Sequence, residues 1–381
     1  MKLAYIHPQD VNDKNLWSGT VYFIYQGIKK KFDDVILLSP INEKFILIKY
    51  LCRILEYVST KLTGKQQINL YSSYLLSVIQ GRIVDKFVKE KHIDCIVSAT
   101  TAPFISTKNK VPLCLITDAT VRLLYEEYSD RKGWSDFYYK DLEKNALKVS
   151  QKSALIISSS SATTNSLIND YDIPSSKVVT IPFGANIEED DIQFRRREID
   201  ANKPIYFLFV GKDWERKGGD IAISICDMLV QQNVNVQLNI VGCKIPEKAQ
   251  RPYVKSYNYL NKNMVDDAKK LRELYKEAHF LSVFSKAEMF GLVFCEAAAY
   301  GLPSITFAVG GIVDIVINNE TGIALSIDSK IEDFAIRISE LISKPVIYQE
   351  MSSNARRRYD ALLNWDVFSE SLKNEIYKRF N

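Results

Sequence analysis

Two glutamates, Glu288 and Glu296, stand in the stretch FSKAEMFGLVFCEAAAYGLPS with seven residues between them, among apolar residues, a glycine and a run of alanines. The apolar run 279–285 predicts a strand, and the pattern from Gly291 predicts a helix that ends near Gly301, since glycine readily adopts the left-handed conformation of a helix C-cap. Glu288 is then expected in a strand-to-helix loop and Glu296 about one turn inside the helix. The question is why a buried-looking segment carries two carboxylates at this spacing.

Groups that suit an anion accompany this pair. The amides of Phe290, Gly291 and Leu292 are expected to point out of the helix N-terminus, which carries about half a positive charge and free donors. Upstream, KDWERKGG supplies three cations in six residues, namely Lys212, Arg216 and Lys217. Together these groups suit a ligand with phosphates and hydroxyls. Taken singly, the cations could belong to a solvated turn, and Glu296 could be a partner of the helix dipole.

The composition narrows the class of protein. A chain of 381 residues is too long for one ordinary core, which favours two domains, and its contents of 46% hydrophobic and 25% charged residues are those of a globular protein. The net charge of +4 fits an anionic ligand or an acidic membrane surface, but it is too weak to indicate a nucleic-acid partner. Six cysteines without a CxxC and only three histidines predict buried free thiols and no metal site.

The N-terminal sequence has no signal-peptide pattern, and no apolar run reaches about 18 residues, so we expect a cytoplasmic protein with at most peripheral contact with the inner membrane. The segment 43–62 has a helical period with a polar side and an apolar side. Its two interpretations are a helix packed on its own domain and an interfacial helix whose basic edge meets anionic lipid.

Short apolar runs alternate with helical patterns along the whole chain, which predicts parallel sheets covered on both faces and two doubly wound α/β domains. A polar, charged and aperiodic segment, 186–203, suits a linker between them. In such sheets the ligand binds beyond the carboxyl ends of the strands, so the cleft between the domains is the expected site. The predicted strands are 2–6, 35–39, 94–98, 112–117, 154–159, 178–183, 204–211, 236–242, 280–285 and 304–309, and the predicted helices include 70–90, 134–152, 161–171, 218–232 and 264–278.

The stretch EMFGLVFCEA, followed by GLP and VGGI, resembles the E-x7-E signature of the retaining glycosyltransferases of family 4, which have the GT-B fold. Other segments agree with that family in the same order: YDIPSSKVVTIPFGAN (171–186), FVGKDWERKGG (209–219), LNIVG (238–242) and NWDVFSESLKNEIYKRF (364–380). The resemblance implies two Rossmann-like domains facing a central cleft. Residues 1–187 would form the acceptor side and 203–364 the donor side, with the C-terminal helix 365–381 crossing back to the first domain.

The resemblance also implies roles for individual residues. Lys217, with Lys212 or Arg216, would bind the diphosphate of a nucleotide-sugar donor. Glu296 would accept hydrogen bonds from the ribose, and Glu288 would bind hydroxyls of the donor sugar, helped by the amides of 290–292. Asp314 stands where the family often has a glutamate. No metal or other cofactor is expected, because GT-B enzymes generally dispense with metal and three cations can balance the departing diphosphate.

In the first half, Gly19 precedes a predicted helix and would let the backbone approach the donor phosphate, as in the family's glycine-containing loop. Many family members have a histidine after a middle strand of this domain, whereas here Asp118 occupies the corresponding place. Asp118 could bind a donor hydroxyl or the acceptor, or it could simply be a helix N-cap. The aromatic and charged segment 125–144 suits either a carbohydrate surface or an ordinary exposed helix.

The function implied is transfer of a sugar, with retained configuration, from a nucleotide-diphosphate donor to a saccharide or lipid-linked saccharide of a bacterial surface polysaccharide or lipopolysaccharide. UDP-sugar is the first choice of donor and GDP-mannose the second. The donor phosphate itself would take the acceptor's proton, so the missing histidine need not abolish activity. The alternatives are a non-catalytic GT-B protein that binds sugar nucleotides or glycans, and a sugar-nucleotide epimerase.

Overall fold

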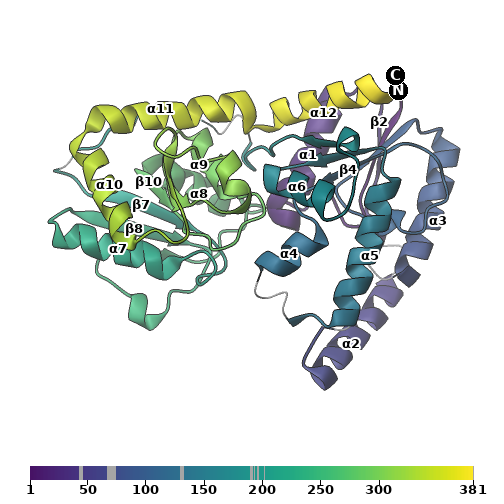
Figure 1. Ribbon diagram of the computed structural model, residues 1–381, viewed down its shortest axis with the longest axis horizontal. Coiled ribbons are helices and arrows are strands. Elements are labelled where there is room, and N and C mark those ends of the chain that lie inside the picture. The colour runs from purple at the N-terminus through teal and green to yellow at the C-terminus, as the bar shows by residue number, and fades with distance from the viewer. Residues whose placement is uncertain are drawn as a thin grey trace. The chain divides into compact units, whose positions relative to one another are not determined.

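The chain divides into two compact units, Met1–Pro182 together with Ser369–Asn381, and Phe183–Phe368. The computed structural model describes all residues except 43–45, 67–73, 129–132, 189–191, 193, 195–196, 201 and 381. Each unit contains a six-stranded, entirely parallel sheet flanked by helices (Figure 1).

The first unit has the strand order β2-β1-β3-β4-β5-β6. Its central strands are short apolar runs buried on both faces, as expected for parallel strands covered by helices. Its elements are β1 (Leu3–Ile6), α1 (Thr20–Lys31), β2 (Val35–Leu38), α2 (Ile46–Thr63), α3 (Tyr74–Lys91), β3 (Cys95–Ser98), β4 (Leu113–Thr117), α4 (Val121–Glu127), α5 (Asp136–Lys152), β5 (Leu155–Ser158), α6 (Ser161–Asn169) and β6 (Val178–Thr180), with short 3-10 turns η1 (Leu16–Gly19), η3 (Ala102–Phe104) and η5 (Ser175–Lys177).

The second unit has the strand order β12-β11-β10-β7-β8-β9. The chain enters at β7 and builds outward to one side with β8 and β9 and to the other with β10, β11 and β12. Its elements are β7 (Ile205–Val210), α7 (Gly219–Gln231), β8 (Val236–Val241), η7 (Glu247–Ala249), β9 (Val254–Tyr257), α8 (Val265–Glu277), β10 (Phe280–Ser282), α9 (Leu292–Ala299), β11 (Ser304–Phe307), η8 (Gly310–Asp314), β12 (Gly322–Leu325), α10 (Ile331–Ser343), α11 (Pro345–Leu362) and the start of α12 (Trp365–Phe380).

The C-terminal helix α12 belongs to both units. Its first residues lie in the second unit, where the Trp365 ring stacks on Phe183 with 5.6 Å between centroids. Its residues from Ser369 onward belong to the first unit, where Tyr377 stacks on Phe32 and Arg379 donates to the carbonyl of Ser176.

The predicted α/β fold class is confirmed, and each of the ten predicted strands is present. The edge strands β9 and β12 were missed; β9 is polar and partly exposed, whereas β12 is a buried run, GIAL, that was not predicted as a strand. The predicted linker was partly wrong: Arg197 and Ile199 are buried in the second unit. Four of the five cysteines whose side chains are described are buried, and Cys243 is partly exposed. Within the described residues, no helix is long and apolar enough to span a membrane.

The half-buried His279 should make the second unit sensitive to acid. Nδ1 of His279 accepts a hydrogen bond of 2.9 Å from the amide of Tyr206, whose ring stacks on the imidazole. Burial and the nearby charge of Arg197 lower the pKa of His279 from 6.5 to about 4. The unfolded chain therefore binds a proton that the folded chain excludes, so stability falls as the pH drops from about 6.5 toward 4.

Replacing this imidazole should make the free energy of unfolding less dependent on pH between pH 7 and pH 5. In the wild type, His279 alone should remove ~2 kcal/mol of unfolding free energy between pH 7 and pH 5. In His279→Asn, whose Oδ1 can accept from the same amide, that loss should be absent. Urea unfolding of both proteins at pH 5, 6 and 7 measures the difference, and parallel pH profiles would contradict the assignment.

Candidate functional site

The site forms where two neighbouring strands of the second sheet end. β7 and β10 pair in parallel, so the loops that follow them leave the same edge of the sheet side by side. These loops are joined by two backbone hydrogen bonds, from the amide of Phe284 to the carbonyl of Lys217 (2.9 Å) and from that of Lys286 to the carbonyl of Arg216 (2.8 Å). The chain adds β8 and β9 on one side of β7 and then β10, β11 and β12 on the other, so the order of the strands reverses between β7 and β10. Ligands of open α/β sheets bind at such a point.

Glycines allow three backbones to meet at this point. Gly218 has φ +70°, and a Cβ there would overlap the carbonyl oxygen of Phe284. Gly310 has φ +50°, and a Cβ there would overlap the carbonyl oxygen of Glu288. The amide of Gly311 donates to that same carbonyl at 3.2 Å. The VGGI segment thus supports the loop that carries Glu288.

Glu288 is 9% exposed and is held through one of its two oxygens. Lys217 Nζ donates to Oε2, Ser285 Oγ donates to it at 3.1 Å, and Arg216 Nη1 lies 3.8 Å away. Oε1 has no hydrogen-bond partner among the residues that the structure describes. Arg216 is shared between Glu288 and Asp213, whose Oδ2 lies 3.5 Å from the Arg216 Nε, and the second oxygen of Glu288 is available to a hydroxyl.

Helix α9 begins beside this group. Gly291 is its N-cap residue, with φ 107°. Within the described part of the chain, the amides of Phe290, Gly291 and Leu292 donate to no protein acceptor. The Phe290 ring is buried against Phe183, at 5.4 Å between centroids. Phe290 thus contributes its backbone, not its side chain, to any ligand site.

Glu296 lies deeper than Glu288, at 2% exposure, and both of its oxygens have partners. Lys262 Nζ donates to Oε1 at 2.5 Å and the Tyr275 hydroxyl donates to Oε2 at 2.9 Å. A buried carboxylate needs such partners to offset its lost hydration. Burial, and then the charge of Glu296, raise the pKa of Tyr275 well above its ordinary value, so this hydroxyl remains a donor.

A buried arginine fixes the two helices that carry this second carboxylate. Arg197 donates to the carbonyls of Tyr275, Lys276 and Ala278 at the end of α8, and to that of Tyr300 at the end of α9. Its positive charge lies at the carbonyl ends of both helices, where the macrodipole favours a cation. Tyr275 and Glu296 are thereby held facing each other.

The third predicted cation lies apart from the other two. Lys212 Nζ stands 4.5 Å from the centre of the Tyr259 ring, a cation–π contact on the segment that follows β9. The same segment carries Lys262. The structure therefore brings Lys217, Arg216 and Glu288 into contact and connects Lys212 to the segment that reaches Glu296.

The predicted residues of the first unit also meet each other. Trp17, Ser18 and Gly19 have φ of 47°, 58° and 98°, three successive left-handed conformations before α1. The Trp17 indole donates to Oδ2 of Asp118 at 3.2 Å, which joins the loop after β1 to the loop after β4. The N-cap alternative for Asp118 was wrong, because Thr120 caps α4 by accepting from the amide of Leu123.

Asp314, placed at the family's glutamate position, lies in η8, and its carbonyl accepts from Arg358. The predicted acceptor segment 125–144 is partly described. Trp134 and Tyr138 are buried against the half-buried Tyr125, which favours packing for these rings. Residues 129–132 of that segment lie outside the described part.

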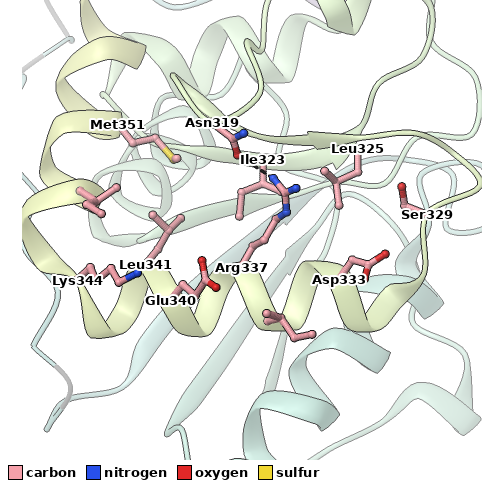
Figure 2. Close-up of a pocket in the computed structure, with 12 residues that line it drawn as sticks. Asn319, Ile323, Leu325, Ser329, Asp333, Arg337, Glu340, Leu341, Lys344 and Met351 are labelled. Carbon is pink, nitrogen blue, oxygen red and sulfur yellow. Dashed lines mark hydrogen bonds between the residues drawn. The ribbon is translucent and has the colours of Figure 1, made fainter.

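A cavity of about 560 Å³ lies elsewhere in the second unit, between β12, α10 and the start of α11. Figure 2 shows Arg337 reaching across it to Asn319, to which it donates at 2.7 Å. None of the residues named above as site candidates lines this cavity. Its floor is apolar and its rim has mixed charge, without the clustered cations found at Glu288.

Comparison with known proteins finds a family model that matches part of the chain. Residues 190–358, most of the second unit, match the family model described as Glycosyl transferases group 1. The chain is 24% identical over 296 residues to the capsular polysaccharide biosynthesis glycosyltransferase CapM of Staphylococcus aureus, covering 74% of this chain and 73% of that protein. Matches to D-inositol 3-phosphate glycosyltransferases cover 52% of those proteins or less.

Solved structures identify the fold. The lipopolysaccharide outer core galactosyltransferase WaaB in its apo form superposes with a TM-score of 0.67 at 15% identity, covering 99% of each chain. HepE from Anabaena in complex with UDP also gives 0.67, at 17% identity, covering 99% of this chain and 100% of that one. The chain has the GT-B fold, and residues 190–358 of its second unit match the glycosyl transferases group 1 model.

Three residues of the site escaped sequence reasoning. Ser285 is the last residue of the predicted strand, three positions before Glu288, so its proximity could have been foreseen. Tyr275 and Lys262 lie 21 and 34 positions before Glu296, on α8 and on the segment between β9 and α8. No local pattern in the sequence connects them to Glu296, since only the tertiary structure brings them there.

The support that Gly310 gives to the Glu288 loop can be tested directly. Gly310→Ala should displace the Glu288 backbone and lower the free energy of unfolding by about 2 kcal/mol or more, since a Cβ would overlap its carbonyl and the left-handed φ disfavours alanine. Gly133→Ala is the control, because nothing lies within 4 Å of a Cβ there. Urea unfolding of both variants measures the effect, and equal stability of the two would contradict it.

Proposed function

We propose that the chain is a retaining, metal-independent glycosyltransferase that moves a sugar from a nucleotide-diphosphate donor to a saccharide acceptor of a bacterial surface polysaccharide or lipopolysaccharide. The observation that carries this proposal is the group around Glu288. Lys217, Arg216 and Ser285 all approach one carboxylate oxygen and leave the other available. This group lies at the N-terminus of α9, inside the segment that matches the glycosyl transferases group 1 family.

In the proposed complex, Lys217 and Arg216 bind the diphosphate, with Lys212 at its far side. Oε1 of Glu288 accepts from a hydroxyl of the donor sugar, the amides of 290–292 donate to donor oxygens, and Glu296 accepts from the ribose. Gly19 lets the backbone of the first unit approach the donor phosphate. Asp118, oriented by the Trp17 indole, binds a hydroxyl of the donor or of the acceptor.

The chemistry asks the protein mainly to position the substrates and to stabilise charge. The bond from the anomeric carbon to the phosphate oxygen breaks, and a bond from that carbon to the acceptor oxygen forms on the same face. The acceptor proton passes to the departing phosphate. The negative charge that grows on the diphosphate is balanced by Lys217 and Arg216, a role that a metal ion fills in other enzymes.

UDP-sugar is our first choice of donor and GDP-mannose the second. HepE, which shares the fold, was solved with UDP, and this supports the first choice. The acceptor class rests on similarity to CapM, a capsular polysaccharide glycosyltransferase, and on the shared fold of WaaB, which acts on lipopolysaccharide. We place the reaction on the cytoplasmic side of the inner membrane.

Donor binding and turnover test the proposal. Among UDP-, GDP- and ADP-sugars, one class should raise the melting temperature, because a ligand that binds only the native state stabilises it. That donor should be consumed, in the presence of EDTA as in its absence. Glu288→Ala and Lys217→Ala should each lower turnover about 100-fold or more, since each removes a group that contacts the reacting donor.

Glu215→Ala and Lys286→Ala are matched controls, because these exposed residues flank the same loops. Both should retain wild-type turnover. Binding without turnover would favour the non-catalytic alternative, and conversion of the donor to another sugar nucleotide without an acceptor would favour an epimerase. If no sugar nucleotide binds, the proposal fails.

We also propose that α2 contacts the membrane surface. Every apolar side chain of α2 that the structure describes is exposed: Tyr50, Ile54, Leu55, Tyr57, Val58 and Leu62. Four of them recur every four residues, from Tyr50 to Leu62, and so form one continuous stripe. Leu62 is 80% exposed and Tyr57 64%. An ordinary surface helix turns such a stripe toward the core.

One polar side chain of α2, that of Glu56, contacts the protein. Oε1 of Glu56 accepts from the Gln66 side chain at 2.6 Å, and the Gln66 backbone pairs with Gly133 and Ser135 beside the start of α5. The segment 46–66 contains four basic residues and one acidic residue, hence a net charge of +3. An exposed apolar stripe with basic residues fits an anionic bilayer surface. Residues 43–45 of the predicted segment lie outside the described part.

Removing part of the stripe should weaken membrane binding. The double variant Ile54→Ser with Leu62→Ser should bind vesicles of phosphatidylglycerol and phosphatidylethanolamine at least about tenfold more weakly than the wild type, because apolar area no longer enters the lipid. Val346→Ser with Ile347→Ser, at exposed positions of α11, should bind as the wild type does. Cosedimentation measures this. Vesicle-independent dimerisation that the double variant abolishes would contradict the proposal and indicate a second copy as the partner.

A further inference from the structure

The two carboxylates of the site differ in how they are held. Glu288 keeps one oxygen without a hydrogen-bond partner among the described residues, whereas Glu296 is in contact with a cation through Oε1 and with a hydroxyl through Oε2. Each carboxylate oxygen can accept two hydrogen bonds. Lys262 and Tyr275 take one on each oxygen of Glu296, so one acceptor position remains on each.

Lys262 is placed to connect three parts of the second unit. It follows β9 and precedes α8, and its ammonium lies 2.5 Å from Oε1 of Glu296 on α9 and 3.4 Å from the carbonyl of Asn186. Asn186 is itself fixed, because its side-chain oxygen accepts from the Trp365 indole at 3.0 Å. The Lys262 side chain is 25% exposed, so the ammonium is partly accessible to solvent.

This arrangement leaves Glu296 one orientation. Its carboxylate lies between the Lys262 ammonium and the Tyr275 hydroxyl, while Arg197 holds the ends of α8 and α9 together behind it. Removal of the ammonium would leave a carboxylate at 2% exposure without its counter-ion, a costly state that rotation or neutralisation would relieve. In either case the two remaining acceptor positions would be lost to a ligand.

We propose that Lys262 is the positioning residue of Glu296, and that the ability of the site to distinguish a ribonucleotide from a 2′-deoxyribonucleotide depends on it. This inference rests on the proposed function, because it takes the ribose of the donor as the partner of Glu296. Lys262 acts through the carboxylate and leaves the bond-breaking step to the groups around Glu288.

The test compares nucleotide pairs that differ by one hydroxyl. Calorimetric titration of the wild-type protein with UDP and 2′-deoxy-UDP, and with the corresponding GDP pair, should show about tenfold tighter binding of the ribonucleotide of the preferred base. Lys262→Met should bind that ribonucleotide as weakly as its deoxy analogue, with the affinity for the analogue changed less than about threefold. Lys262→Arg should restore most of the difference, and KM for the donor should rise in Lys262→Met with kcat nearly unchanged.

Lys269→Met, at an exposed position of α8, is the control and should keep the wild-type difference. If Lys262→Met keeps the tenfold difference, or weakens both nucleotides equally, the role of Lys262 is overturned while the proposed function stands. If the wild type binds UDP or GDP with the same affinity as the 2′-deoxy analogue, Glu296 is not the ribose contact and the inference fails. If the wild type binds neither nucleotide, the inference and the proposed function fall together.

Discussion

The pairing of β7 with β10 is the constraint on which the site depends. Because these strands run in parallel, both of their following loops leave one edge of the sheet, and two backbone hydrogen bonds join them there. That junction puts Lys217 and Arg216, from the first loop, against Glu288 of the second. The left-handed glycines at 218 and 310 are needed because no Cβ fits where these backbones meet. The order of the strands therefore brings the cations of the first loop to the carboxylate of the second.

The site contains two carboxylates in different electrostatic surroundings. Glu288 faces Lys217 and Arg216, which hold only one of its oxygens, and a phosphate could replace part of that contact. Glu296 is closed in by Lys262, Tyr275 and the helix ends that Arg197 caps, and it provides a fixed pair of acceptors. One group can thus respond to the charge of a ligand while the other holds a constant geometry. Neither arrangement requires a proton transfer by a glutamate.

The fold class could be predicted because continuous apolar strands alternating with helices have few other solutions. The edge strands could not, since β9 is polar and half-exposed and its pairing with β8 is decided by the sheet. The positions of Glu288 and Glu296, one in a loop and one in a helix, followed from local signals at Gly291 and Gly301. Their partners did not: Lys262 reaches Glu296 from the segment between β9 and α8, 34 positions away in the sequence. Helix α2 is a different case. Its period in the sequence predicts an apolar stripe, but it does not predict that the stripe is exposed.

We propose that the groups around Glu288 and Glu296 hold the two ends of one nucleotide sugar. A crystal structure of the protein with its donor, or with the nucleoside diphosphate and the free sugar, tests it most directly. The account predicts phosphate oxygens within hydrogen-bond distance of Lys217 and Arg216, a sugar hydroxyl on Oε1 of Glu288 and the ribose on Glu296. A nucleotide bound in the cavity between β12 and α10, with Glu288 and Glu296 contacting only protein groups, would contradict it.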